Sequence, residues 1–308
     1  MSKNAFTSAS KIPDLKYDVV YTNITGKKDL IFPIFTSFKM DLPYQNITNK
    51  TDYVTAYDFE VFDVSKTISL MKGMKPLLFG VSGLYLILTF AGRKFMQSRP
   101  PFQISSLMVW WNVFNAAFGL VATLRAAPET LHLLLNPDGV YNVICKMDVH
   151  NYATSFWWLM FVVSKFLELG DTAFIVLRKQ PLSILHWWHH STTLLITWYS
   201  FELYDPMWRT FVLNTSVHFF MYTYYTLKAL GFKLSRKIAF CITTMQIVQI
   251  LILIYLHMTW VNYQYQGVHC QRPTGFAIVQ FFPIIIFLGL LLNFYFKSYL
   301  QPKKSKLN

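Results

Sequence analysis

Seven long apolar runs constrain this chain of 308 residues more than any other feature of its sequence. A helix needs about 20 apolar residues to cross the hydrocarbon core of a bilayer. The runs that reach or approach this length are 76–92, 102–124, 154–177, 181–199, 207–227, 238–260 and 276–296. Only 14% of the residues are charged, against about a quarter in soluble domains, so the surface has too little polarity for water. The sequence therefore predicts an all-α, polytopic membrane protein with seven transmembrane helices.

The charged residues between these runs indicate the orientation of the chain. A net charge of +13 could suggest a nucleic-acid partner, but the basic residues gather in short links between apolar runs, so we expect no nucleic acid. The first, third and fifth links and the C-terminal tail are basic, whereas the alternate links are mixed or acidic. Cytosolic loops carry the excess of Lys and Arg. The C-terminus is therefore predicted in the cytosol and, with seven spans, the N-terminus in the lumen.

The two ends of the chain indicate the endoplasmic reticulum. Residues 1–70 show no helical or strand periodicity and form a predicted lumenal extension without chemistry of its own, followed by a membrane domain over 71–300. The extension holds glycosylation sequons at Asn23, Asn46 and Asn49, although sequons also arise by chance. The tail, 301–308, ends in a K-x-K-x-x pattern formed by Lys304 and Lys306, which fits a cytosolic retrieval signal or a simple topological flank.

Several polar side chains lie inside the predicted spans, where each is costly and therefore a candidate for function. They are Lys165, Glu168, Asp171, His186, His189, His190, Asn214, His218, Tyr222, Gln246 and Gln249. At a rise of about 1.5 Å per residue, all fall in the cytosolic half of the membrane, although neighbouring spans run in opposite directions. Polar contacts between helices would account for the amides, but they account poorly for four histidines. We interpret the group as a reaction site.

Two kinds of chemistry fit these histidines. Membrane desaturases and hydroxylases hold two irons with about eight ligands, and only four histidines lie here, so a di-iron site is disfavoured while a single metal ion remains open. A neutral imidazole can instead act as a base or as a nucleophile toward an acyl thioester. The links at the cytosolic mouth suit an anionic, phosphate-bearing substrate, although topology alone also explains their charge. Their basic residues are Arg178, Lys179, Lys233, Arg236 and Lys237.

Four motifs in order resemble those of the very-long-chain fatty-acid elongases, over roughly residues 75–300. They are Lys165-x-x-Glu168-x-x-Asp171-Thr172, His186-x-x-His189-His190, Asn214-x-x-x-His218-x-x-Met221-Tyr222-x-Tyr224-Tyr225 and Thr243-x-x-Gln246-x-x-Gln249. The two tryptophans inside the histidine box resemble the branch that handles saturated and monounsaturated chains.

This resemblance implies a fold and a reaction. Six helices would surround a narrow acyl tunnel, with the first helix outside. The enzyme, a 3-oxoacyl-CoA synthase of the endoplasmic reticulum membrane, would condense acyl-CoA with malonyl-CoA to give 3-oxoacyl-CoA, CoA and carbon dioxide, without metal or cofactor. Its expected partners are the reductases and dehydratase of the elongation cycle, and a homo-oligomer is compatible with the sequence.

The resemblance also suggests an acyl–imidazole intermediate. We select His189 as the nucleophile, with His218 beside the malonyl thioester and with His186 and His190 orienting groups or transferring protons. The alternative is a single step in which a histidine acts only as a base. Other function classes are a metal-dependent lipid desaturase or hydroxylase that uses the histidine box, a seven-span receptor and a transporter.

The three cysteines follow the predicted topology. Cys145 and Cys270 both lie in lumenal links, where the environment is oxidising, so we expect a disulfide between them rather than two free thiols. Cys241 lies near the cytosolic start of a span and should remain reduced.

Overall fold

The structure is a computed structural model that describes residues 46–147 and 150–301. The Asn23 sequon and Lys304 and Lys306 of the C-terminal pattern lie outside these residues. The described α-helices are α1 (Val64–Gly73), α2 (Lys75–Met96), α3 (Ser105–Leu135), α4 (Gly139–Cys145), α5 (Tyr152–Leu177), α6 (Ile184–Glu202), α7 (Phe211–Ala229), α8 (Arg236–Tyr265) and α9 (Thr274–Tyr295). Two short strands, β1 (Ile47–Thr48) and β2 (His150–Asn151), pair in parallel. The remaining elements are η1 (Asp58–Glu60), η2 (Pro206–Thr210) and η3 (Phe296–Leu300).

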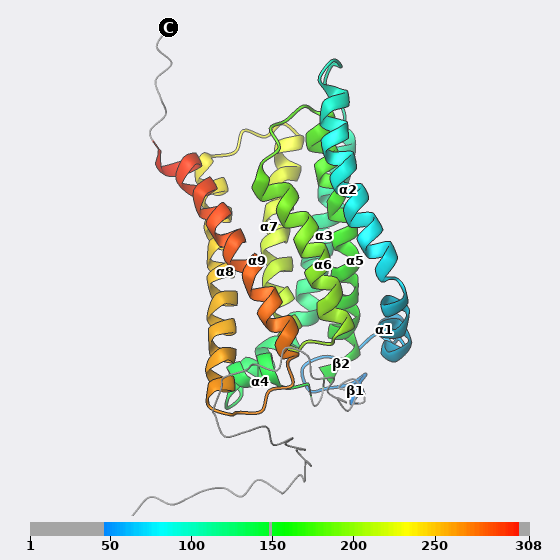
Figure 1. Ribbon diagram of the computed structural model, residues 1–308, viewed down its shortest axis with the longest axis vertical. Coiled ribbons are helices and arrows are strands. Elements are labelled where there is room, and N and C mark those ends of the chain that lie inside the picture. Colours follow the sequence, from blue (N-terminus) through cyan, green and yellow to red (C-terminus); the bar gives the residue numbers. More distant parts are fainter. Residues whose placement is uncertain (1–45, 148–149, 302–308) are drawn as a thin grey trace, which may run out of the picture. The chain divides into compact units, whose positions relative to one another are not determined.

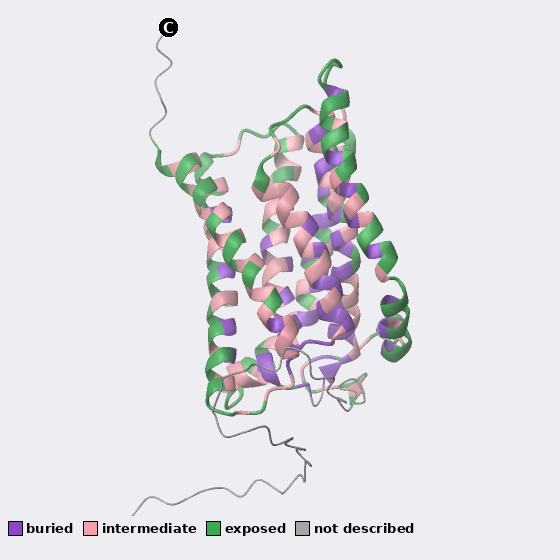
Figure 2. Cartoon of the chain, in the orientation of Figure 1, coloured by how far each residue is buried: buried purple, intermediate pink, exposed green. Residues whose placement is uncertain are grey.

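Seven of these helices, α2, α3 and α5 to α9, fall on the seven predicted spans. By length and composition, α2, α3, α8 and α9 with its extension η3 are apolar enough to cross a membrane. Helices α5, α6 and α7 are not among these four, and they carry most of the polar residues of the predicted site. Much of α2, α8 and α9 is exposed in Figure 2, and large apolar side chains such as Ile87, Leu251 and Phe282 are among the exposed residues. The protein is an all-α, polytopic membrane protein, as predicted.

Six helices close a ring in the order α3, α7, α8, α9, α6 and α5, and α2 packs outside it against α5 and α6 (Figure 1). The most extensive contact joins α3 to α7. A side chain at Gly119 of α3 would lie 2.8 Å from the carbonyl oxygen of Thr215 in α7, so only glycine permits this approach. Beside it, the hydroxyl groups of Thr123 and Thr215 hydrogen-bond at 2.8 Å. The ring and the external helix agree with the expected arrangement.

Local signals set the start and end of the helices that carry the site. The Asn151 side chain caps α5 by accepting from the Ala153 amide, and the Ser183 side chain caps α6 by accepting from the His186 amide. Helix α5 ends just before Lys179, whose positive φ of 55° reverses the chain. The Ser183 cap thus sets where the histidine helix begins, three residues before the first histidine.

The two ends of the ring differ in character. The end that holds β2, α4 and η2 is called here the β2 end, and the opposite end, with the links 97–104, 178–183 and 230–235, is called the basic end. The sequons at Asn46 and Asn49 are exposed beside β1, which pairs with β2.

Part of the predicted N-terminal extension forms a helix, which the sequence analysis did not predict. Helix α1 crosses the expected boundary at residue 70 and buries Val64, Ile68 and Met71 against the ring. Its apolar stripe is only three residues long, which is too short to stand out from the sequence. The short helix α4 was missed for the same reason.

Several charges assigned to the links form ion pairs at the β2 end. Asp205 and Arg272 lie in links as expected, whereas Glu129 lies within α3 and Arg209 within η2. The ion pairs are Arg125–Glu60, Arg209–Glu129 and Arg272–Asp205, with N–O distances of 2.5, 3.0 and 3.1 Å. Both partners of the last two pairs are fully or almost fully buried. In the first pair, burial alone would raise the pKa of Glu60, but hydrogen bonds from Arg125, the Tyr57 amide and Trp157 outweigh it and lower that pKa. These pairs tie the links to the helices.

Candidate active site

A chain of ionic and polar contacts joins α5 to α7. The Lys165 ammonium donates to Glu168 Oε1 at 2.7 Å and to Asn214 Oδ1 at 3.0 Å. His218 Nδ1 lies 3.6 Å from the same oxygen of Glu168. The Lys165 and Glu168 side chains are almost completely buried, so each charge depends on the other for compensation. Four of the predicted site residues therefore form one connected group.

Asp171 faces a different set of partners. Its two carboxylate oxygens accept hydrogen bonds from Trp111 Nε1 of α3 and from the Tyr222 hydroxyl of α7, both at 2.6 Å. A side chain at Gly170 would lie 2.8 Å from the Trp111 ring, so this glycine admits the tryptophan. Asp171 thus ties α3, α5 and α7 together. Sequence reasoning missed Trp111, because nothing in the sequence distinguishes it from other apolar residues of its span.

The three histidines of α6 lie in contact with one another. The ring centroids of His186 and His190 are 4.3 Å apart, and those of His189 and His190 are 5.4 Å apart. His189 also stacks on Phe287 of α9 at 4.4 Å. Phe287 therefore packs against one face of the His189 ring.

A chain of hydroxyl groups reaches His186 from outside the ring. The Thr172 hydroxyl lies 2.9 Å from His186 Nε2, and the Tyr85 hydroxyl of α2 lies 2.9 Å from the Thr172 hydroxyl. Each hydroxyl has a single proton, so a donor at one end of the chain fixes the direction of both bonds. Tyr85 was not anticipated from the sequence.

A cavity of about 140 Å³ extends from the histidines toward the β2 end. Its walls include His189, Asn214, Gln249 and Phe287 near the site, and Met207 and Trp208 of η2. The hydroxyl groups of Thr192 and Thr197, also in the wall, donate to carbonyl groups of their own helix, which leaves the lining mainly apolar. Of the four site histidines, all within the described residues, His189 is the one that lines this cavity.

A second, much smaller cavity of about 10 Å³ adjoins the ionic group. Lys165, Glu168, His218 and Tyr222 line it, together with Asn214, which lines both cavities. His189 and His218 therefore line two different cavities, and Asn214 lies in the wall of both.

One predicted site residue, Gln246, lies outside the walls of both cavities. Its side chain donates to Met221 Sδ at 3.5 Å.

The basic residues expected to hold a phosphate-bearing substrate lie at the basic end, but three of them already have partners. Arg178 donates to Met108 Sδ, Lys179 to the carbonyl groups of Gln97 and Arg99, and Arg236 to the Ser298 carbonyl group. Lys233 and Lys237 are exposed.

The donor set fits a metal ion poorly. Within residues 46–147 and 150–301, no three His, Cys, Asp or Glu side chains converge as ligands. Both oxygens of Asp171 are engaged by Trp111 and Tyr222, and Glu168 is paired with Lys165.

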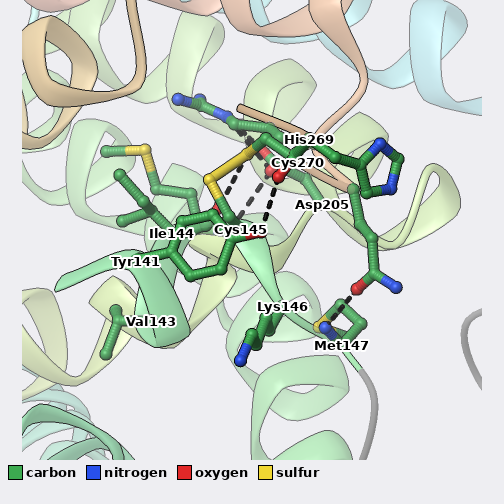
Figure 3. The surroundings of a disulfide bond; sticks show 12 residues. Tyr141, Val143, Ile144, Cys145, Lys146, Met147, Asp205, His269 and Cys270 are labelled. Carbon is green, nitrogen blue, oxygen red and sulfur yellow. Dashed lines mark hydrogen bonds and ion pairs between the residues drawn. A yellow bond between two sulfur atoms is a disulfide. The ribbon is translucent and has the colours of Figure 1, made fainter. Parts of the chain in front are cut away.

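The structure contains the disulfide expected from the sequence. Cys145, at the end of α4, is bonded to Cys270 in the link between α8 and α9, with α-carbons 4.5 Å apart (Figure 3). The Gln271 amide donates to the Cys145 carbonyl, and the Tyr141 hydroxyl donates to the His269 carbonyl, so the two segments also pair through hydrogen bonds. Cys241 is free and exposed.

A ring of membrane helices that places a histidine cluster beside a mainly apolar cavity is the arrangement of a membrane enzyme. Residues 70–307 match the ELO model, described as the GNS1/SUR4 family. The chain belongs to this family.

Individual proteins show the same relationship. The chain is 36% identical over 261 residues to "Very long chain fatty acid elongase 6" of Drosophila melanogaster, covering 82% of this chain and 81% of that protein. It is 35% identical to the human protein of the same name, covering 79% of this chain and 92% of that protein. It is also 35% identical to "Putative fatty acid elongase 4" of Caenorhabditis elegans, covering 73% and 79% respectively.

Proposed function

We propose that this protein catalyses the condensation step of fatty acid elongation, in which acyl-CoA and malonyl-CoA give 3-oxoacyl-CoA, CoA and carbon dioxide. The observation that carries the proposal is His189, a half-buried imidazole that stacks on Phe287 and lines a mainly apolar cavity. An acyl chain in that cavity would bring its thioester carbonyl to the imidazole. The family and the names of the relatives agree with this reaction.

The reaction would proceed in two stages. A nitrogen of His189 attacks the thioester carbonyl carbon, the C–S bond breaks, and the CoA thiolate leaves with the proton from the other imidazole nitrogen. Malonyl-CoA then loses carbon dioxide, and the resulting enolate attacks the acyl–imidazole. The C–N bond breaks, the departing imidazolate takes up a proton from solvent, and the 3-oxoacyl-CoA product and neutral His189 result. Two stages suit a narrow cavity, because the two CoA thioesters need not be bound together.

The other site residues support these stages. His218, beside Glu168, would face the malonyl thioester, while His186 and His190 contact each other and would move protons near the leaving group. Lys165 and Asp171 would hold the helices and their partners in position. The basic end would receive the CoA phosphates through Arg178, Lys179, Lys233, Arg236 and Lys237.

The cellular setting follows from the same proposal. The protein would reside in the endoplasmic reticulum membrane, with the basic end toward the cytosol and the β2 end, with its exposed Asn46 and Asn49, toward the lumen. The reductases and dehydratase that consume the product would be its partners. Saturated and monounsaturated acyl chains are the proposed substrates.

Purified protein tests this function directly. Wild-type protein should form 3-oxoacyl-CoA only when malonyl-CoA is present, and His189→Ala should lower the rate by several orders of magnitude, because the covalent route is lost. His269→Ala, an exposed histidine at the β2 end, is the matched control and should retain the wild-type rate. A His189→Ala variant that kept a tenth of the wild-type rate would exclude this nucleophile.

The competing metalloenzyme is tested in the same assay. Activity should survive dialysis against a strong chelator. Loss of activity on dialysis, with recovery on addition of iron or zinc, would favour a metal-dependent enzyme instead.

A further inference from the structure

The amide of Asn214 has a defined orientation. Lys165 can only donate hydrogen bonds, so the Asn214 atom 3.0 Å from its ammonium must be the carbonyl oxygen. Lys165 is in turn fixed by Glu168 at 2.7 Å. The Asn214 NH₂ group therefore lies on the side away from Lys165. Asn214 lines the same cavity as His189, so a donor on the side away from Lys165 is available to that cavity.

A second amide lies in that wall. Gln249 of α8 is only 8% exposed, and its side chain has no hydrogen-bond partner among the residues that the structure describes. The neighbouring Gln246, three residues earlier, donates to Met221, and Gln280 accepts from Arg272. The Gln249 amide, which lines the cavity, is therefore available to hydrogen-bond a ligand there.

We infer that Asn214 Nδ2 and Gln249 Nε2 are the oxyanion donors of the site. When His189 attacks, the N–C bond forms and the π electrons of the thioester carbonyl move to its oxygen. The two amides donate to that oxygen, and its charge returns when the C–S bond breaks and CoA leaves. This inference rests on the proposed function and assigns the electrostatic part of that reaction to two residues.

The charge arrangement around the amides favours this role. Lys165 polarises the Asn214 carbonyl, which makes its NH₂ group a stronger donor. Asn214 of α7, Gln249 of α8 and His189 of α6 all line the same cavity. A donor acts most strongly in a buried site that excludes water, and removal of one such donor typically lowers kcat by about 10²–10³-fold.

Isosteric variants test the inference. Gln249→Glu and Asn214→Asp keep the side-chain shape and remove the N–H donor. Each should lower kcat by about 10²–10³-fold and change KM by less than about threefold, because the interaction forms mainly in the transition state. Gln266→Glu, the same substitution at the exposed residue that follows α8, is the matched control and should leave both values unchanged.

A spectroscopic measurement separates hydrogen bonding from structural damage. Acyl-CoA labelled with ¹³C at the thioester carbonyl is bound to His189→Ala protein, which cannot form the acyl–imidazole. The carbonyl infrared band should lie lower than for the same thioester in an apolar solvent, and adding Gln249→Met should shift it upward. The band is read only from bound substrate, so a variant that fails to fold gives no band. If the double variant gives none, the position of the carbonyl band in His189→Ala protein decides whether the oxygen accepts hydrogen bonds.

The outcomes are distinguishable. Wild-type protein that forms no 3-oxoacyl-CoA overturns the proposed function. Wild-type activity together with Gln249→Glu and Asn214→Asp rates within threefold of wild type overturns the oxyanion assignment alone. An unshifted carbonyl band in His189→Ala protein overturns it as well.

Discussion

Replacement of Arg209 by methionine should destabilise the protein strongly. The Arg209 and Glu129 side chains are 1% and 0% exposed, and the guanidinium donates to Glu129 at 3.0 Å and to the Lys146 carbonyl at 2.6 Å. Methionine fills much of the space but leaves the carboxylate buried, with the Asn151 amide as its remaining donor among the described residues. Removing one partner of a buried pair costs about 3–5 kcal/mol. The ratio of folded to unfolded protein should fall by about a hundred- to several-thousand-fold.

Unfolding of detergent-purified protein at pH 7 measures this change. Lys94→Met, an exposed lysine near the end of α2, is the control and should alter the free energy of unfolding by less than about 0.5 kcal/mol. The double variant with Glu129→Gln should recover part of the loss, because the uncompensated charge is then absent. A single-variant loss below about 1 kcal/mol, or a double variant no more stable than Arg209→Met, would refute the reasoning about the buried charge.

Three further predictions concern other parts of the chain. Burial lowers the pKa of His150 to about 3. As pH falls from about 6.5 toward 3, this group therefore lowers the free energy of unfolding by about 1.4 kcal/mol per pH unit. In His150→Gln protein, the free energy of unfolding should fall less steeply with decreasing pH. Cys145→Ser should lower the free energy of unfolding by about 2–5 kcal/mol and Cys241→Ser by less than about 0.5 kcal/mol; equal effects of the two would contradict a stabilising disulfide. Tyr85→Phe, which keeps the ring but breaks the hydroxyl chain to His186, should lower kcat by about three- to tenfold and displace its pH profile without a change in the melting temperature; an unchanged profile would leave Tyr85 as a packing residue.

The spans and the depth of the site could be predicted from the sequence because both depend on order along the chain. Apolar length alone identifies a membrane helix, and a constant rise per residue places Glu168, His189 and His218 at a common level. The four motifs then indicated which helices contribute residues to the site. The structure adds which atoms meet.

The partners of the site residues could not be predicted in the same way. Trp111 and Tyr85 reach Asp171 and Thr172 from helices whose sequences show only apolar runs, and a contact between helices depends on their rotation and crossing. Gln246 and Gln249 are equally polar in the sequence, but only Gln249 lines the cavity. Their difference is set by the packing of α8 against α7.

The buried ion pairs at the β2 end show a further limit. Glu129 and Arg209 are 80 residues apart, and each lies near the end of an apolar run, where charges normally meet water. Only the folded links, with β2 and α4 over the helix ends, exclude that water. A charge in a link therefore indicates topology but does not reveal its burial.

Mass spectrometry of the acyl–enzyme tests the central claim most directly. Purified protein is incubated with acyl-CoA alone, digested and mapped. The account predicts that the peptide containing His189 gains the mass of one acyl group, that one equivalent of CoA is released, and that malonyl-CoA then removes the modification and yields 3-oxoacyl-CoA. An unmodified His189 in protein that still turns over both substrates, or an acyl group on a different residue, would contradict it.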